Sequence, residues 1–251
     1  DEWGGGKGIY LADNPLTNPP IEIVKQGNKA ILSYFEKIEK EREYLYEAKM
    51  LIVGEGGAGK TTLRNLIARV EENVLLKTVH YITRLLNTPK QEEKECSTRG
   101  IDVVQHRFAH EKSEKPFVAN IWDFGGQQIY HATHRFFLSE RALYVVVMDL
   151  RRDSDGFEYW LESVEKFGKD SPVLILLNQK ADREHFQIDE GNVKKRFKHV
   201  RKIASFNLRS EKEEDKNALA LFVQDIQLEM QRLPLVGSVV PKSWKEVRQQ
   251  I

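Results

Sequence analysis

The sequence predicts an α/β fold, with a mostly parallel six-stranded sheet and helices on both faces. Two observations along the chain indicate this fold. Short apolar runs typical of buried strands alternate with segments of helical spacing, and a glycine-rich turn follows the first strand. A length of 251 residues suits one large domain, or one domain with appendages.

The strands are read from apolar runs, and the helices from apolar residues spaced three or four positions apart. The first strand, 49–53, is followed by a helix from Gly59 to Val70. The further strands are 101–110, 116–122, 142–150, 172–177 and 200–206. The further helices are 156–168, 189–198 and 215–232. Before the domain we expect a helical segment at 21–48, and between the first helix and the next strand a mobile loop at 77–97.

Composition and charge exclude several classes of protein. The net charge is +1, so nothing indicates attraction to nucleic acid or to an acidic membrane. The one cysteine, Cys96, excludes a disulfide framework and favours a reducing, cytoplasmic location. No apolar run is long enough for a transmembrane segment. The start, DEWGGGKGIY, lacks the apolar stretch of a signal peptide, and we expect a piece of a longer protein.

The glycine-rich turn after the first strand carries the strongest functional signal. Residues 54–61, GEGGAGKT, satisfy the phosphate-loop pattern G-x-x-x-x-G-K-[ST]. The glycines let backbone N–H groups converge on an oxyanion, and Lys60 can reach the β and γ phosphates of a nucleotide. The Thr61 hydroxyl can ligate Mg²⁺, and the helix that starts there adds its positive dipole end.

A second candidate ligand for the metal, an acidic residue, follows the strand at 116–122. In NIWDFGGQ, residues 120–127, Asp123 can hold the Mg²⁺ shell and the N–H of Gly126 can bind a γ-phosphate. Gln127 comes directly after and can orient an attacking water. The pattern D-x-x-G is weak alone, and the phosphate loop upstream makes it specific.

The loop after the strand at 172–177 bears on the choice of base. Residues 179–182, QKAD, fit the guanine-reading pattern N-K-x-D, with Gln179 where Asn is usual and Asn178 one place earlier. The Asp182 carboxylate would accept from N1–H and the amino group of guanine, a donor pair that adenine lacks. The stem of Lys180 would pack over the base. The candidate for a loop that backs the base or ribose is SFNLRS, residues 205–210.

Together these positions resemble Ras-type small GTPases, and more closely the Roc domain of Roco proteins. STRGIDV at 97–103 is similar to switch I of that family, and residues 122–151 are similar to its switch II and the strand that follows. Residues 11–35 look like the end of a leucine-rich repeat array, and residues 233–248 resemble the opening of a COR domain. The resemblance covers nearly the whole chain. Two departures are Gln179 and a loop before Thr98 that is longer than usual for the family.

The resemblance implies a P-loop, Ras-like fold and a switch that binds GTP or GDP with Mg²⁺ and hydrolyses GTP. Because no strong general base is visible in the sequence, we expect unassisted turnover to be slow. The resemblance divides the chain into the end of a leucine-rich repeat region with a connecting helix (1–46), a Roc GTPase domain (47–232) and the start of COR (233–251). Its nucleotide state would control contacts between Roc and COR. The implied partners are guanine nucleotide, the COR domain and leucine-rich repeats of the same chain, and a second copy in a homodimer.

The predicted site comprises three overlapping sets of residues, of which the role of Thr98 is implied by the resemblance alone. The catalytic residues are Gln127, Thr98 and Lys60. The metal ligands are Thr61, Thr98 and Asp123. The nucleotide-binding residues are Gly54, Glu55, Gly56, Gly57, Ala58, Gly59, Lys60, Thr61, Thr62, Asp123, Gly126, Gln179, Lys180 and Asp182.

Two other functions stay open. One is a nucleotide-gated dimerisation or interaction module with negligible turnover, which would hold guanine nucleotide mainly to organise dimer or COR contacts. The other is an ATP-using P-loop regulator, which rests only on the imperfect guanine motif. His131 and His134 lie three residues apart, but without a third ligand nearby they do not indicate zinc. Candidates for an arginine finger, each with a surface salt bridge as the commoner role, are Arg99, Arg135, Arg141 and Arg151.

Overall fold

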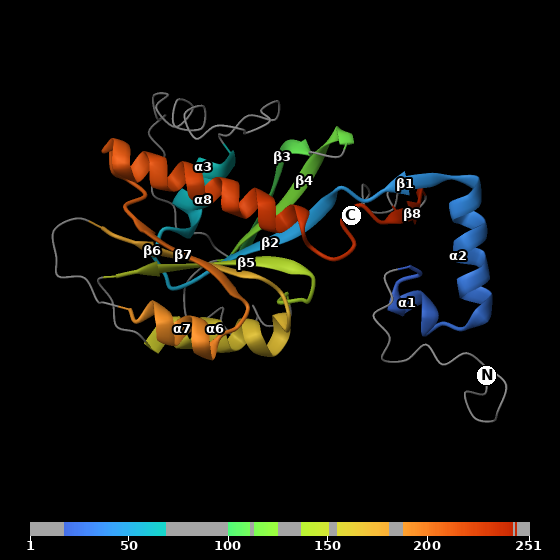
Figure 1. The fold of residues 1–251 in the computed structure, drawn as a ribbon, viewed down its shortest axis with the longest axis horizontal. Helices are drawn as coiled ribbons and strands as arrows, with labels where there is room; N and C mark the ends of the chain where they lie inside the picture. The colour runs from blue at the N-terminus through green and yellow to red at the C-terminus, as the bar shows by residue number, and fades with distance from the viewer. Residues whose placement is uncertain are drawn as a thin grey trace. The chain divides into compact units, whose positions relative to one another are not determined.

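The computed structural model describes residues 18–68, 100–110, 113–124, 137–150, 155–180, 188–242 and 244 (Figure 1). The chain divides into two compact units. The larger unit is Glu47–Leu233, and the smaller unit combines Asp1–Tyr46 with Pro234–Ile251. Among the described residues, no helix is both long enough and apolar enough to cross a membrane.

A six-stranded sheet forms the centre of the larger unit, in the strand order β3-β4-β2-β5-β6-β7 (Figure 1). The outer pair, β3 with β4, is antiparallel, and the other neighbouring strands are parallel. This confirms the predicted, mostly parallel sheet of an α/β fold. The strands are β2 (Glu47–Val53), β3 (Ile101–His110), β4 (Ser113–Phe124), β5 (Ala142–Asp149), β6 (Val173–Asn178) and β7 (Val200–Phe206).

Helices cover both faces of this sheet, as the sequence predicts. On one face lie α3 (Lys60–Ala68) and α8 (Glu213–Gln231), and on the other α6 (Asp155–Gly168) and α7 (Glu190–Arg196) (Figure 1). Asp189 is the N-cap of α7, since its side chain accepts a hydrogen bond from the N–H of Asn192. Acidic residues fill the first turn of α8, where they interact favourably with the helix dipole.

The central strands are buried on both faces, which explains their unbroken apolar runs. Every residue of β5 and β6 is buried. Tyr144 and Val146 point to the same side of β5 and belong to a hydrophobic cluster with Trp160 of α6. The carboxyl ends of β2, β4, β5 and β6 meet at one edge of the sheet, which is where ligands bind in open α/β folds.

The smaller unit is built from two distant parts of the chain. Gly27 adopts a φ of 89° and separates α1 (Ile21–Val24) from α2 (Asn28–Lys40). After α2 the chain is extended as β1 (Arg42–Tyr44), which pairs antiparallel with β8 (Val239–Pro241). The prediction of a helical segment over 21–48 is therefore confirmed for Ile21–Val24 and Asn28–Lys40, and it is wrong after residue 40, where the chain forms β1 and enters β2.

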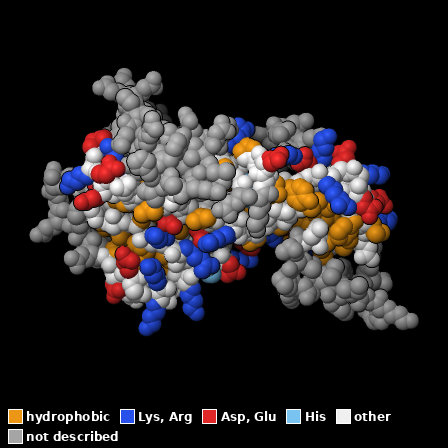
Figure 2. Space-filling view, turned by 45° about the horizontal axis from the view of Figure 1, so that its top comes forward, with side chains coloured by type: hydrophobic (Ala, Val, Ile, Leu, Met, Phe, Trp, Pro, Cys, Tyr) orange, Lys and Arg blue, Asp and Glu red, His pale blue; other side chains and the backbone are white. Residues whose placement is uncertain are grey.

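Tyr34 connects α2 to the two-stranded sheet of the smaller unit. Its hydroxyl donates to the carbonyl oxygen of Val239 at 3.1 Å, and its ring contacts Trp244. Hydrophobic side chains also reach the surface of this unit (Figure 2), where Leu32, Phe35 and Tyr44 are exposed. The assignment of 1–46 to a repeat region and of 233–251 to COR stays a prediction.

Candidate functional site

The phosphate loop, residues 54–61, connects the end of β2 to the start of α3 at the carboxyl edge of the sheet. Gly54, Gly57 and Gly59 have φ values of 141°, 75° and 115°, which residues with a side chain rarely adopt. Gly54 also passes close to β5, since a Cβ there would lie 2.1 Å from the carbonyl oxygen of Val147. The path of the loop therefore requires glycine for both conformation and space.

Lys60 is the first residue of α3, and its ammonium group points back into the loop. Its Nζ donates to the carbonyl oxygens of Gly54 and Glu55 at 2.9 and 2.8 Å, and the residue is 5% exposed. These two acceptors hold a buried positive charge against the glycine-rich backbone. That position suits the predicted role of Lys60 in binding the β and γ phosphates.

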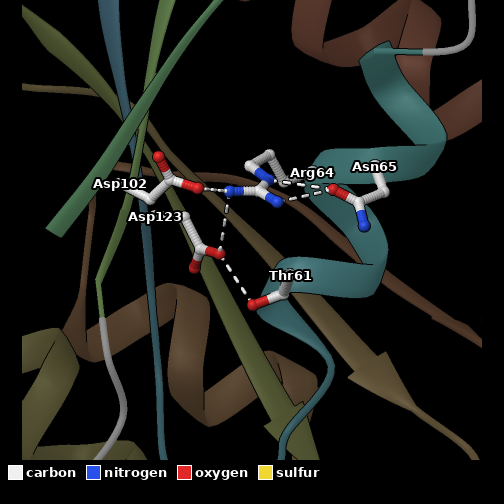
Figure 3. Close-up of polar contacts among 5 residues, drawn as sticks. All are labelled: Thr61, Arg64, Asn65, Asp102 and Asp123. Carbon is white, nitrogen blue, oxygen red and sulfur yellow. Dashed lines mark hydrogen bonds and ion pairs between the residues drawn. The ribbon is translucent and has the colours of Figure 1, made fainter. Parts of the chain in front are cut away.

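Thr61 and Asp123 meet at the predicted metal position (Figure 3). Thr61 Oγ1 donates to Asp123 Oδ2 at 2.7 Å, and Asp123 is fully buried. The parallel pairing of β2 with β4 brings them together, because it sets Ile52 beside Asp123. Hydroxyl and carboxylate oxygens are ligands that Mg²⁺ prefers, with phosphate oxygens and water completing its shell. The Thr61–Asp123 pair therefore fits a Mg²⁺ ion that is bound together with a nucleotide. A separate kind of metal site, a cluster of three or more His, Cys, Asp or Glu, does not occur among the described residues.

Asn178, the last residue of β6, joins the phosphate loop to the segment after β7. Its Nδ2 donates to the carbonyl oxygen of Ala58 at 2.8 Å, and its Oδ1 accepts from the N–H of Leu208 at 3.2 Å. Gln179 instead donates through Nε2 to Ser205 Oγ at 2.7 Å, in a bond at the surface. The motif spacing assigned the asparagine role to Gln179 and left Asn178 out of the predicted site. The sequence signal that could have found Asn178 is an amide at the end of a wholly apolar strand.

The predicted base-side segments also lie against the loop. The N–H of Gln179 donates to the carbonyl oxygen of Phe206 at 3.0 Å, so 205–210 lies beside the QKAD motif. Lys180 donates through Nζ to the carbonyl oxygen of Gly57 and pairs with Asp149 Oδ2 at 3.2 Å. Asp149, which motif reasoning also missed, is buried at the end of β5 and fixes the position of the Lys180 charge.

Comparison with known proteins identifies the family. Residues 77–182 match the family model described as "Ras of Complex, Roc, domain of DAPkinase". The solved structure of Methanosarcina barkeri Roco2 RocCORdC bound to GDP aligns with 84% of this chain and 57% of that chain, with a TM-score of 0.63 and 32% identity. The chain carries a Roc GTPase domain. The Ras-like P-loop fold implied by the resemblance is thereby confirmed.

Curated relatives of this Roc domain are much longer proteins. The chain is 34% identical over 170 residues to the probable serine/threonine-protein kinase pats1 of Dictyostelium discoideum, a match covering 67% of this chain and 5% of pats1. It is 33% identical over 215 residues to a Roc-COR-CHAT protease of Runella zeae, covering 76% of this chain and 21% of that protein. The chain thus spans a small fraction of the length of these relatives.

The structure describes some of the remaining candidate residues of the Roc domain and not others. Gly56 and Thr62 are half-buried, in the phosphate loop and the first turn of α3. Outside the described residues lie Arg99, His131, His134, Arg135, Arg151 and the predicted site residues Thr98, Gly126, Gln127 and Asp182. The roles of those four site residues stay predictions.

Arg141 is the one arginine-finger candidate within the described residues. It directly precedes β5, so it lies at the amino end of that strand. The 8 residues of β5 span roughly 26 Å. Because the phosphate loop lies at the carboxyl edge of the sheet, Arg141 is at the wrong end of β5 to act as a finger within its own chain.

Proposed function

We propose that this Roc domain binds GTP and GDP together with Mg²⁺ and slowly hydrolyses GTP to GDP and phosphate. One observation carries the proposal: the buried Lys60, the Thr61–Asp123 pair and the base-side residues Asn178 and Lys180 all converge on the phosphate loop. The GDP bound to the Roco2 structure supports a guanine nucleotide as the ligand.

Each predicted site residue has a distinct role in this proposal. Lys60 and the N–H groups of the loop bind the phosphates. Thr61 and Asp123 hold the metal side, with Thr98 joining them when GTP is bound. Bound Mg²⁺ would neutralise charge on the phosphates. Asn178 and Lys180 hold the base-side segments against the loop, and Asp182 selects guanine.

Slow hydrolysis follows from what the site offers the attacking water. In the proposed roles Lys60 binds the phosphates, Thr61 holds the metal and Asn178 bonds two backbone groups, so none of these three side chains is assigned to the attacking water. Orientation of the water falls to Gln127, and Gly126 senses the γ-phosphate. Because the amide of Gln127 can orient a water but cannot take its proton as a strong base would, we expect unassisted turnover to be slow.

The nucleotide state acts through contacts with neighbouring domains. The COR domain of the same chain is the first proposed partner, because Roc and COR occur together in the Roco2 and Runella proteins. Leucine-rich repeats and a second copy of the chain are further proposed partners, in the cytoplasm. On the face of the molecule that Figure 2 shows, basic and acidic side chains of the described residues are interspersed, and the net charge of the chain is +1, so we propose no nucleic-acid partner.

A displacement titration tests the choice of nucleotide. Fluorescent GDP is bound in the presence of Mg²⁺ and then displaced by GTP, GDP or ATP, with wild type and Asp182→Ala. GTP and GDP should compete about a hundredfold or more better than ATP, because guanine alone satisfies the Asp182 carboxylate. Asp182→Ala should remove most of that preference. Equal competition by ATP would instead support an ATP-using regulator, and no binding of any nucleotide would refute the proposal.

An alternative is a nucleotide-gated dimerisation or interaction module with negligible turnover. The pairing of Roc with COR in the Roco2 and Runella relatives favours it, because such a domain can act through contacts with its neighbours. Gln127→Ala separates the two functions in a single-turnover measurement of phosphate release. If the domain is a GTPase, the rate should fall by about tenfold or more, since removing one transition-state contact has at least that effect. A rate near that of free GTP in both proteins would favour the interaction module.

A further inference from the structure

Three charged side chains from three elements meet beside the metal position (Figure 3). Asp102 of β3 and Asp123 of β4 are direct cross-strand partners in the antiparallel pair. Two like charges placed opposite each other on neighbouring strands repel. Arg64 of α3 reaches between them and donates through Nη1 to Asp102 Oδ2, and the same nitrogen lies 3.9 Å from Asp123 Oδ2.

The Arg64 guanidinium is held in place by its other contacts. Its Nε and Nη2 both donate to Asn65 Oδ1, at 3.0 and 2.8 Å, while Nη1 donates to Asp102. The Arg64 side chain is 14% exposed, so solvent screens its charge only partly. Arg64 is therefore a fixed cation next to Asp123, with its direct hydrogen bonds made elsewhere.

Asp123 Oδ2, which faces Arg64, is also the atom that accepts the Thr61 hydroxyl. Any cation bound by Thr61 and Asp123 is therefore close to the positive charge of Arg64. Asp102, Asp123 and Arg64 together carry one net negative charge, and loss of Arg64 would leave two. Because Asp123 is fully buried, this difference in charge acts on the site with little screening.

We infer that Arg64 weakens Mg²⁺ binding at Asp123 and so sets the Mg²⁺ concentration needed to hold the nucleotide. Asp102 has the opposite effect, because it compensates the charge of Arg64. The nucleotide phosphates must then supply much of the binding energy for Mg²⁺, which keeps the metal and nucleotide exchangeable. The inference rests on the proposed function, since it requires that the domain binds nucleotide with Mg²⁺.

The test measures the release of a fluorescent GDP from the whole chain over a series of free Mg²⁺ concentrations. The readout is the Mg²⁺ concentration that gives half-maximal slowing of release. Arg64→Gln should lower this concentration by about tenfold, because one positive charge beside a divalent cation is removed. Asp102→Asn should raise it by a smaller factor, since Asp102 is half-exposed and its charge is better screened. Arg64→Lys, which keeps the charge, should stay near wild type.

The two variants should shift the half-maximal Mg²⁺ concentration in opposite directions if Arg64 acts through its charge. The other explanation is a brace, meaning that the Arg64–Asp102 ion pair only holds α3 against β3. A brace predicts that Arg64→Gln and Asp102→Asn raise the half-maximal concentration together, and that result overturns the inference. An unchanged concentration in Arg64→Gln also overturns it, provided that circular dichroism shows a folded variant. If Arg64→Gln does not fold, the pair Asp102→Asn and Arg64→Lys is used instead. A value at or below wild type in Asp102→Asn, or a raised value in Arg64→Lys equal to that in Asp102→Asn, rejects the inference. Failure of wild type to bind GDP is a separate outcome that rejects the proposed function itself and the inference with it.

Discussion

Replacing Gly54 with alanine should lower the free energy of unfolding of the larger unit by about 3 kcal/mol. The new Cβ would lie 2.1 Å from the carbonyl oxygen of Val147. Neither group can easily move away, because Val147 lies in the fully buried β5, whose neighbour β2 leads directly into Gly54. The φ of 141° at Gly54 adds conformational strain to this overlap. Urea unfolding followed by circular dichroism measures the loss.

Gly100→Ala is the matched control for Gly54→Ala. Gly100 also has a positive φ, of 81°, but a Cβ there would meet nothing within 4 Å. It should therefore show conformational strain alone, about 1 kcal/mol. Equal losses in the two variants would show that the close approach of the loop to β5 contributes nothing. A stability near wild type for Gly54→Ala would contradict the described path of the phosphate loop.

The strands of the large sheet were predictable because burial on both faces leaves a strong local signal. VLILL of β6 and ALYVVVM of β5 are apolar at every position. In an α/β protein, apolar runs this short usually form buried parallel strands. The strand pair β1–β8 leaves no such signal. Each strand has 3 residues, and the two are nearly two hundred positions apart. Only tertiary pairing makes the segment after α2 a strand rather than a continuation of the helix.

The site was predictable where chemistry depends on spacing along the chain, and less so where it depends on contacts across the sheet. The phosphate loop is contiguous, so its pattern located Lys60 and Thr61, and the D-x-x-G pattern located Asp123. Asp149, Asp102 and Arg64 take part through the packing of separate elements. Nothing in their local sequence distinguishes them from ordinary surface charges.

Asn178 shows how a shift of one position can mislead motif reading. The pattern N-K-x-D aligns Gln179 with the usual asparagine, but the structure gives the buried bridging contacts to the preceding residue. Gly59 also depends on this arrangement, since a Cβ there would lie 2.6 Å from Asn178 Nδ2. The phosphate loop, the end of β6 and the loop after β7 therefore meet around one amide.

Replacing Asn178 with alanine should destabilise the larger unit by about 3 kcal/mol and weaken GDP binding by more than tenfold. The stability loss follows because the variant leaves the Ala58 carbonyl and the Leu208 N–H without their bonds to the amide, and each buried polar group left unpaired costs about 1–3 kcal/mol. The affinity falls because the base-side segments are no longer held against the phosphate loop. Urea unfolding and a titration with fluorescent GDP measure the two effects.

Gln179→Ala is the control for Asn178→Ala, since it removes the neighbouring amide and a single bond to Ser205. Because that bond lies at the surface, where water can replace it, the variant should lose about 0.5 kcal/mol and little affinity. The contrast tests which amide does the work of the motif asparagine. A large loss in Gln179→Ala with a small one in Asn178→Ala would return that role to the position assigned by motif spacing. Equal losses would mean that both amides are needed to hold the base-side loop.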